Sequence, residues 1–401
     1  MSDIIISNIG PNVNSQFNEL RVASKFPVVE LTSVYGLSDL RDVVTTAGSG
    51  TVTNDGTEYL ISTGVGGTDT AILESALRGR YQPGYAGEAG VGVRLPVNPT
   101  GTQVARWGLF DSENGAFFGT TSSTIFAAIR RGGVDTVIPQ ASWNVDPLDG
   151  SGPSGATLSL SEGNIYQIVF TWYGYGVVEF RVVIPNPLTL AQEVVTVHRY
   201  VPSGQTSFID PNLPLRGEVD NAGTASSLTL FMGGRQYTII GKFNPVFRIT
   251  SEVRSVSGVG ATLRPVISFR RKAEFPAGSG RPNSVNVLLQ GVNIVSSLDI
   301  AFQVLVGGTV DGTFVNFPTA TTNIPDDETS LLVNNNSTTF TGGEVVYQGV
   351  SSGGSSISRV TAQAELLDFQ LPDDEIVTLA VANLEGGTAT VNATFLVLES
   401  W

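Results

Sequence analysis

The fold class is decided by Tyr166-Gln167-Ile168-Val169-Phe170-Thr171-Trp172, by Val177-Val178-Glu179-Phe180-Arg181-Val182-Val183, and by Tyr173-Gly174-Tyr175-Gly176 between them. The two outer runs alternate apolar with polar or small side chains, which is the period-two pattern of a half-buried strand. Glycine tolerates positive φ, so the four residues between the runs suit a tight turn. This stretch therefore predicts a β-hairpin.

The same pattern recurs along the chain. Ser227–Met232 and Gln236–Ile240 flank Gly233-Gly234-Arg235 and predict a second hairpin. The best helical candidate is the short segment Ser38–Val44, in which Ser38 is suited to cap the first turn. No long segment has helical periodicity. We therefore expect an all-β protein built from antiparallel, jelly-roll-like β-sandwiches.

Changes in composition along the chain predict four regions. Residues 1–30 are polar and rich in asparagine, and they predict an extended N-terminal anchoring arm. Residues 31–250 hold three of the four tryptophans and predict the main, aromatic-rich sandwich. Residues 251–282 are rich in glycine, serine and proline and predict a linker. Residues 283–401 predict a second, smaller β-sandwich.

The composition argues against catalysis. The 401 residues include 46 glycines but no cysteine and a single histidine, His198. Most acid/base and nucleophilic chemistry near neutral pH uses histidine or cysteine, because their pKa values lie closest to the working range. We therefore expect a structural or binding protein rather than an enzyme, with no cofactor and no resident metal.

The charge narrows the range of partners. Only 14% of residues are charged and the formal net charge is −14, which argues against binding to nucleic acid through its phosphates. A surface with so few charges has to expose serine, threonine and asparagine, or be covered in an assembly. No apolar run approaches the length of a membrane span and the N-terminus does not match a signal peptide, so synthesis in a cytoplasm is expected.

Several motifs resemble those of a known group of proteins. The motifs are Arg78–Tyr85, Arg106–Asp111, Asn114–Gly119, Arg130–Gly133, Trp143–Asp146 and Phe170–Gly176. Together they resemble virion structural proteins of tailed phages and other large double-stranded DNA viruses, of the fibre, spike or capsid-decorating kind. The order Trp-Gly-x-Phe-Asp and then Asn-Gly-x-x-Phe-Gly also resembles the hairpin of concanavalin-like jelly rolls.

The resemblance implies a homo-oligomer, with a trimer as the first expectation, on the capsid, spike or tail of a virion made in a host cytoplasm. Residues 1–30 would dock on other virion proteins and the β domains would project, with host-surface glycans as a further partner. The resemblance carries no catalytic residues onto this chain.

Four aromatic residues are the candidates for contact with a glycan or a neighbouring subunit: Trp143, Trp172, Tyr173 and Tyr175. Flat apolar rings suit sugar faces, and tyrosine and tryptophan keep a polar handle. Tyr173 and Tyr175 lie in a glycine-flanked turn that leaves them little room to be buried. The same exposed aromatics are also typical of protein interfaces.

The remaining chemical candidates have simpler interpretations. His198 is expected to be a hydrogen-bonded structural residue, because alternation places it in a strand without a serine and aspartate arranged as a triad. Asp326-Asp327-Glu328 and Asp373-Asp374-Glu375 each follow a proline and are expected to be turns, with calcium as the alternative. The alternative function is a carbohydrate-binding or polysaccharide-degrading protein, since glycoside hydrolysis needs only two suitably spaced carboxylates.

Overall fold

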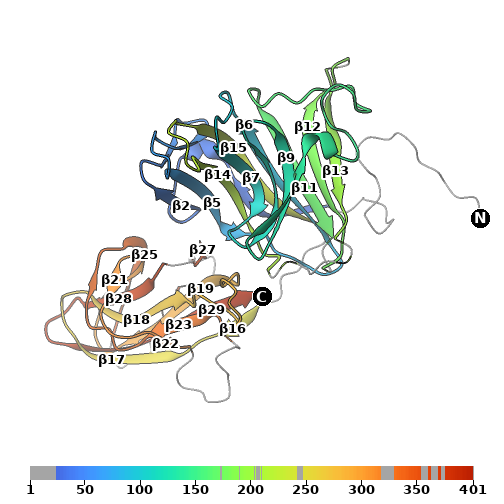
Figure 1. The fold of residues 1–401 in the computed structure, drawn as a ribbon. Helices are drawn as coiled ribbons and strands as arrows, with labels where there is room; N and C mark the ends of the chain where they lie inside the picture. Colours follow the sequence, from blue (N-terminus) through green and yellow to red (C-terminus); the bar gives the residue numbers. More distant parts are fainter. Residues whose placement is uncertain are drawn as a thin grey trace, which may run out of the picture. The chain divides into compact units, whose positions relative to one another are not determined.

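The chain forms two compact units, Met1–Asn244 and Pro245–Trp401, and each is described by itself. The computed structural model describes residues 24–171, 174–188, 190–202, 204, 208, 210–241, 247–317, 329–353, 360–362, 369–371 and 375–400. Within these ranges the regular structure is antiparallel β-strand, with two single 3₁₀ turns at Ser33–Tyr35 (η1) and Gln140–Ser142 (η2) and no α-helix. The predicted all-β, antiparallel sandwich class is confirmed (Figure 1).

Among the described residues, unit 1 holds one eight-stranded and one seven-stranded sheet. The eight-stranded sheet runs, in spatial order, β13 (Gln192–Tyr200), β12 (Val178–Pro185), β11 (Asn164–Thr171), β6 (Ala86–Arg94), β15 (Thr229–Ile240), β4 (Tyr59–Ser62) and β3 (Thr51–Asn54), with β1 (Lys25–Leu31) also paired to β15. The seven-stranded sheet runs β10 (Val134–Pro139), β9 (Ile125–Arg131), β8 (Asn114–Thr120), β7 (Val104–Phe110), β14 (Pro214–Asp220), β5 (Thr70–Arg78) and β2 (Asp42–Ala47).

Large aromatic side chains join the two sheets of unit 1. Trp107 of β7 packs edge-on against Tyr166 of β11, with ring centroids 5.0 Å apart. Phe118 of β8 lies 5.3 Å from Phe180 of β12 in the same geometry. All four rings are buried. Such rings each bury a large apolar area and prefer edge-to-face contacts, so they make the inter-sheet core and hold the sandwich closed.

One predicted hairpin is confirmed. β11 and β12 pair antiparallel, with Ile165 opposite Val183 and Phe170 opposite Val178. Gly174 in the turn has φ of 78°, a conformation that glycine adopts without steric cost.

The second predicted hairpin is wrong. Residues 229–240 form the single strand β15, and Gly233-Gly234 is a β-bulge within it. Met232 pairs with Val93 of β6 and Arg235 pairs with Val91, so β15 has one residue more than its partner at this point. Glycine is favoured in both a hairpin turn and a bulge, which is why the sequence pattern does not separate the two.

The predicted short helix is also wrong. A turn closes from the Asp42 backbone N–H to the Ser38 carbonyl, 2.8 Å, and the chain then enters strand β2. The run Asp42–Ala47 is rich in valine and threonine, whose branched side chains pack well on a pleated sheet. The strand preference of Asp42–Ala47 therefore outweighs the helix-capping tendency of Ser38.

Unit 2 is a second sandwich of two sheets. Within its described residues, one sheet contains β16 (Arg248–Thr250), β29 (Ala389–Ser400), β19 (Asn286–Ser296), β26 (Val360–Ala362), β17 (Val253–Val259) and β27 (Phe369–Gln370). The other contains β22 (Val315–Asn316), β23 (Leu331–Asn334), β18 (Arg264–Arg271), β28 (Val377–Asn383), β20 (Ile300–Val306) and β25 (Glu344–Ser351). A two-stranded ladder joins β21 (Thr309–Val310) to β24 (Phe340–Thr341). Phe269 of β18 and Phe395 of β29 meet across the sandwich, with centroids 5.3 Å apart.

Two predicted regions take other structure. The predicted linker, 251–282, contains strands β17 and β18, which pair with β29 and β28. Gly258, with φ of 74°, lies at a register shift within β17, and Gly278, with φ of 73°, lies in a turn after β18. The end of the predicted arm, residues 25–30, lies in strand β1, and residues 1–23 lie outside the described residues.

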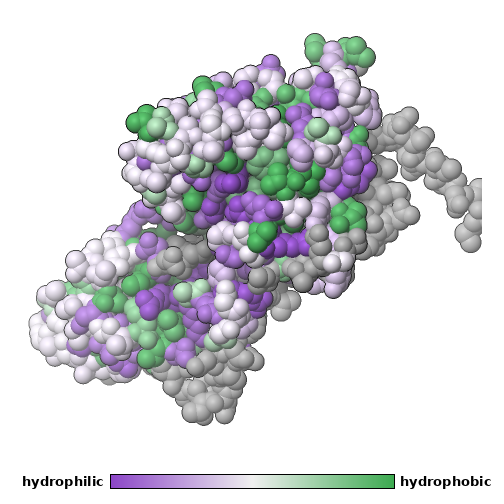
Figure 2. All heavy atoms as spheres, in the orientation of Figure 1, coloured by the Kyte–Doolittle hydropathy of each residue, from purple (hydrophilic) through white to green (hydrophobic). Residues whose placement is uncertain are grey.

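The surface agrees with the low charge of the composition. Figure 2 shows residues of intermediate hydropathy over much of the visible face, with hydrophilic and hydrophobic residues interspersed. None of the helical segments within the described ranges is long and apolar enough to cross a membrane.

A buried ion pair links the two sheets of unit 1. The Arg235 guanidinium on β15 donates to the Asp42 carboxylate on β2, and both side chains are almost wholly excluded from solvent. Arg235 also lies 5.0 Å from the ring centroid of Tyr59 on β4. Its Nε and Nη1 find no hydrogen-bond acceptor in the described part of the chain. Asp42 is therefore the group that compensates a cation buried in the core.

Removing Asp42 should destabilise unit 1 strongly. Asp42→Ala leaves Arg235 buried and unpaired, so we expect a loss of about 3–5 kcal/mol in the free energy of unfolding. The double variant Asp42→Leu/Arg235→Met, which replaces both charges with apolar groups, should recover most of that loss. Denaturant titration of the unit 1 transition measures both. Equal destabilisation by the two variants would contradict this role of the pair.

Candidate functional site

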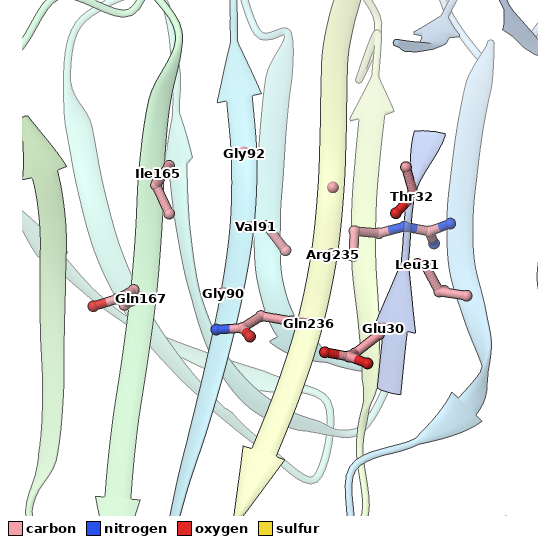
Figure 3. Close-up of a pocket in the computed structure, with 11 residues that line it drawn as sticks. Glu30, Leu31, Thr32, Gly90, Val91, Gly92, Ile165, Gln167, Arg235 and Gln236 are labelled. Carbon is pink, nitrogen blue, oxygen red and sulfur yellow. The ribbon is translucent and has the colours of Figure 1, made fainter. Parts of the chain in front are cut away.

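The outer face of the eight-stranded sheet carries a groove whose floor is bare backbone. On β6 the side chains of Ala89, Val91 and Val93 point into the core, which leaves Gly90 and Gly92 on the outer face. Gly234, in the bulge of β15, lies beside them. The resulting groove, here called the glycine groove, has a volume of about 440 Å³ (Figure 3). Volumes of this order are typical of small-molecule sites.

Polar side chains surround the glycine groove. Glu30 and Thr32 come from β1 and the residue after it, and Gln167 comes from β11. The side chains of these three residues make no hydrogen bond or ion pair to any described residue. Ile165, 41% exposed, adds an apolar surface on β11. The groove therefore combines free donors and acceptors with a small apolar contact.

Gln236 closes one side of the groove floor. Its side chain extends from β15 over β6 beside Gly90 (Figure 3). A Cβ at position 90 would lie 3.2 Å from the Gln236 Cγ, so glycine there lets the carboxamide lie flat on the sheet. The Gln236 Nε2 is 3.4 Å from the Glu88 carboxylate. This contact orients the amide along the groove.

Arg235 lines the groove with its backbone but turns its charge away. Its guanidinium lies in the core against Asp42, so it offers no cation to a ligand in the groove. Glu30 is the one charged side chain that faces the groove among the described lining residues.

Other charged groups on this sheet are already paired. Glu179 contacts Arg181, and its other oxygen accepts from Arg199 at 3.0 Å. Burial by itself would raise the pKa of Glu179, but the two guanidinium groups outweigh it and hold that pKa below its ordinary value. Glu88 likewise pairs with Lys25. These carboxylates act as partners in salt bridges.

The seven-stranded sheet has a similar network on its outer face. Glu218 on β14 contacts Arg216 and accepts from Arg106 on β7 at 2.5 Å, while Arg216 reaches Glu74 on β5 at 3.0 Å. Burial favours the neutral form of Glu218, yet the two arginines lower its pKa overall. A carboxyl group held ionised in this way cannot serve as a general acid, which needs a raised pKa.

A second hollow, here called the end pocket, opens where β6 ends and β11 begins. Its volume is about 590 Å³. Its described lining residues, none of which is charged, are Pro96, Asn98, Thr120–Ile125, Gln140 and Leu158–Ser161. The Asn98 side chain makes no hydrogen bond within the described residues, while Gln140 donates from Nε2 to the Pro147 carbonyl at 2.8 Å and leaves its Oε1 free. The end pocket is therefore a neutral site rich in hydroxyl and amide groups.

Of the four predicted contact residues, the two that the structure describes, Trp143 and Tyr175, do not line either hollow. Trp143 is buried against Phe118 and donates from Nε1 to the Ile138 carbonyl at 3.2 Å, so its ring belongs to the core. Tyr175 is 73% exposed in the β11–β12 turn, at the opposite end of β11 from Ile165. Trp172 and Tyr173 lie outside the described residues.

His198 is a packed structural residue in the described surroundings. Its Nδ1 accepts from the Asn144 backbone N–H at 3.2 Å, and its ring lies 6.3 Å from that of Phe180. Burial lowers its pKa below the ordinary 6.5. A register shift between Phe180 and Arg181 in the β12–β13 pair turns His198 toward Phe180, away from the face on which Thr196 pairs with Arg181.

The acidic clusters are only partly described. Asp326, Asp327, Glu328, Asp373 and Asp374 lie outside the described residues. Within the described ranges, no three histidine, aspartate or glutamate side chains gather closely enough to hold a metal ion.

Sequence reasoning missed both hollows. The available signal was the spacing Gly90-x-Gly92 in a strand whose intervening residues are apolar, which places two glycines on one exposed face. That signal does not reveal the rim, because Glu30, Gln167 and Gln236 come from strands far apart in the sequence.

Comparison with known proteins gives structural neighbours alone. No family model and no curated protein matches the chain. An endo-1,3-beta-glucanase from Streptomyces sioyaensis aligns over 54% of this chain and 97% of its own, with 9% identity and a TM-score of 0.37. A legume lectin-like domain from Entamoeba histolytica aligns over 54% of this chain and 98% of its own, with 12% identity and a TM-score of 0.32. At these scores the likeness says nothing about what this chain binds.

The single histidine should give unit 1 a distinct pH dependence. Because the folded pKa of His198 lies below its unfolded value of about 6.5, the unfolded state binds the proton more readily. The free energy of unfolding should therefore be highest above pH 6.5 and fall as the pH drops through 6.5 toward the folded pKa. Denaturant titrations between pH 5.5 and 7 measure this slope. His198→Gln should flatten it, and an unchanged slope in that variant would contradict the assignment.

Proposed function

We propose that unit 1 is a carbohydrate-binding domain and that the glycine groove is its binding site. The observation that carries the proposal is the set of polar side chains, Glu30, Thr32 and Gln167, that have no partner among the described residues and surround a floor without side chains. A floor of this kind lets a flat ring approach the backbone closely. The rim then supplies the hydrogen bonds that fix its orientation.

The chemistry of the rim suits a sugar ring. A pyranose carries hydroxyl groups that both donate and accept around a ring with apolar faces. The Glu30 carboxylate accepts, the carboxamides of Gln167 and Gln236 donate and accept, and Ile165 offers an apolar contact. Each satisfied hydrogen bond contributes about 0.5–1.5 kcal/mol net, so a few of them give a weak single site.

We propose binding without hydrolysis. Glycoside hydrolysis uses a pair of carboxyl groups, one of which must be held protonated. Glu30 is the one carboxylate among the described residues that line the groove, and the end pocket has none. Glu179 and Glu218 on the outer faces have lowered pKa values because of their arginine partners. These features support a lectin-like role.

Filling the groove should abolish binding while leaving the fold intact. A Cβ at Gly92 would find no atom closer than 3.9 Å, so Gly92→Leu fits the sheet and projects its side chain into the groove. We expect at least about a tenfold loss of affinity, or about 1.4 kcal/mol, for any glycan found in an array screen. Titration calorimetry with that glycan measures the loss.

The matched control is Gly386→Leu in unit 2. A Cβ there also meets nothing within 4 Å among the described residues, so this variant adds the same side chain to the other unit of the chain. It should bind as the parent does. The proposal fails if Gly92→Leu binds with parental affinity, or if no glycan binds the parent protein.

We further propose that the chain works as a homo-oligomer on a virion. Two observations support this setting. The first is the resemblance of the motifs Arg78–Tyr85 and Arg106–Asp111 to virion structural proteins. The second is the edge strand β10, which ends the seven-stranded sheet and exposes Val134 (70%) and Val137 (50%), where a neighbouring subunit could pair. Display of several weak sites on one particle would raise their combined strength.

The oligomeric state can be measured directly. Light scattering of the intact protein should give a multiple of the 42.2 kDa chain mass. Val137→Lys on β10 should lower that mass, because a charge on an edge strand opposes pairing with another chain. If the parent protein is a stable monomer, the proposal of a homo-oligomer on a virion fails. The proposal that the glycine groove binds a glycan is not affected by that result.

A further inference from the structure

We propose that the glycine groove and the end pocket form one continuous track that binds an extended, uncharged oligosaccharide. This inference rests on the proposed function, and it names the class of ligand: a neutral glycan of several units rather than a single sugar. It also gives the end pocket a role as the second half of the site.

The glycine groove lies on β6 and β11, and the end pocket begins just beyond the ends of these two strands, where the loops after β6 and before β11 meet the β8–β9 turn of the other sheet. On β6 and its continuation the chain passes from Gly92 in the groove to Pro96 in the pocket. On β11 it passes from Ile165 in the groove back to Ser161 in the pocket. Both paths span four residues, which corresponds to roughly 13 Å in extended chain. β6 and β11 are paired through Val93 and Asn164 at this point, so the two paths run side by side.

The surface between the hollows is open on the β11 side. Gly163 is exposed, and a Cβ built there meets no atom within 4 Å. The neighbouring Asn164 turns inward, donating from Nδ2 to the Ser159 carbonyl at 2.7 Å and to the Glu162 carbonyl at 2.9 Å. A ligand that leaves the groove on this side therefore meets Gly163, which has no side chain, and then the exposed carboxylate of Glu162, which disfavours an anionic ligand, before it reaches Ser161.

On the β6 side the charge between the hollows is already neutralised. Arg94 donates from Nε to both carboxylate oxygens of Glu58 at 2.9 Å, and its guanidinium lies over the ring of Phe231, 3.9 Å from the centroid. The positive charge of Arg94 is therefore already paired with Glu58, at the edge of the proposed track. Nothing in this arrangement selects for an anionic ligand.

The chemistry of the end pocket points the same way. Its lining is uncharged, with the Asn98 amide and the Gln140 Oε1 free to bond to hydroxyl groups. The carboxylate of Glu30 at the other end and the net charge of −14 disfavour polyanionic glycans. A neutral polyhydroxylated chain matches both halves of the track.

The test is a series of neutral oligosaccharides of increasing length, built from the sugar that binds in an array screen. With the parent protein, we expect affinity to rise by at least about tenfold from the single sugar to the chain that spans both hollows, and then to level off. Two variants divide the track: Asn98→Ala removes a free amide from the pocket, and Gly163→Leu blocks the path between the hollows.

In both variants the affinity should no longer increase with the length of the oligosaccharide, while the affinity for the single sugar should equal that of the parent protein. Gly386→Leu serves again as the control and should keep the gain. If short and long glycans bind equally well to the parent protein, or if both variants keep the gain, the track is wrong while the groove proposal stands. If no sugar of any length binds, the proposed function itself fails.

Discussion

The β-bulge at Gly233-Gly234 is the constraint on which unit 1 depends. Before the bulge, Leu230 and Met232 point into the core, at even positions of β15. After it, Arg235, Tyr237 and Ile239 point into the core, at odd positions. A regular strand alternates between its two faces, so if the same residues paired without the bulge, Arg235, Tyr237 and Ile239 would face outward. The bulge lets one strand serve both halves of the sheet.

The same extra residue links the core to the candidate site. It brings Arg235 inward, where the guanidinium meets Asp42 and ties β15 to the edge strand of the other sheet. It also leaves Gly234 on the outer face opposite Gly92, and so removes side chains from the groove floor. The stability of the sandwich and the shape of the groove thus have a common local origin, and an insertion or deletion at this point would alter both.

Because one bulge shapes both the core and the groove, some features of unit 1 could be predicted from the sequence and others could not. Alternation in β11 and β12 is local, and the predicted hairpin is present because each strand carries its own pattern. Gly233-Gly234 satisfies the requirements of a turn and of a bulge equally, and the choice depends on pairing with β6, more than 130 residues away in the chain, which local pattern does not show. Trp143 is aromatic, which suggests a contact residue, but its burial depends on how the turn after β10 folds back onto Phe118 of β8, which local pattern does not show. Local chemistry therefore predicts strands, while the site arises from register.

The register also accounts for the separation of charge from the candidate site. On both outer faces, opposite charges stand across neighbouring strands, as Arg106 and Glu218 do on β7 and β14. In such pairs the arginine keeps the carboxylate ionised and bound to it. The outer faces therefore carry charged groups that are not available to bind a ligand. The two hollows fall where glycine, serine, threonine and amide side chains take the place of those pairs. A neutral ligand that forms many hydrogen bonds gains most at such places, because it displaces water without separating an ion pair. In this chain a low content of charge and a high content of glycine are thus properties of the candidate binding surface as well as of the composition.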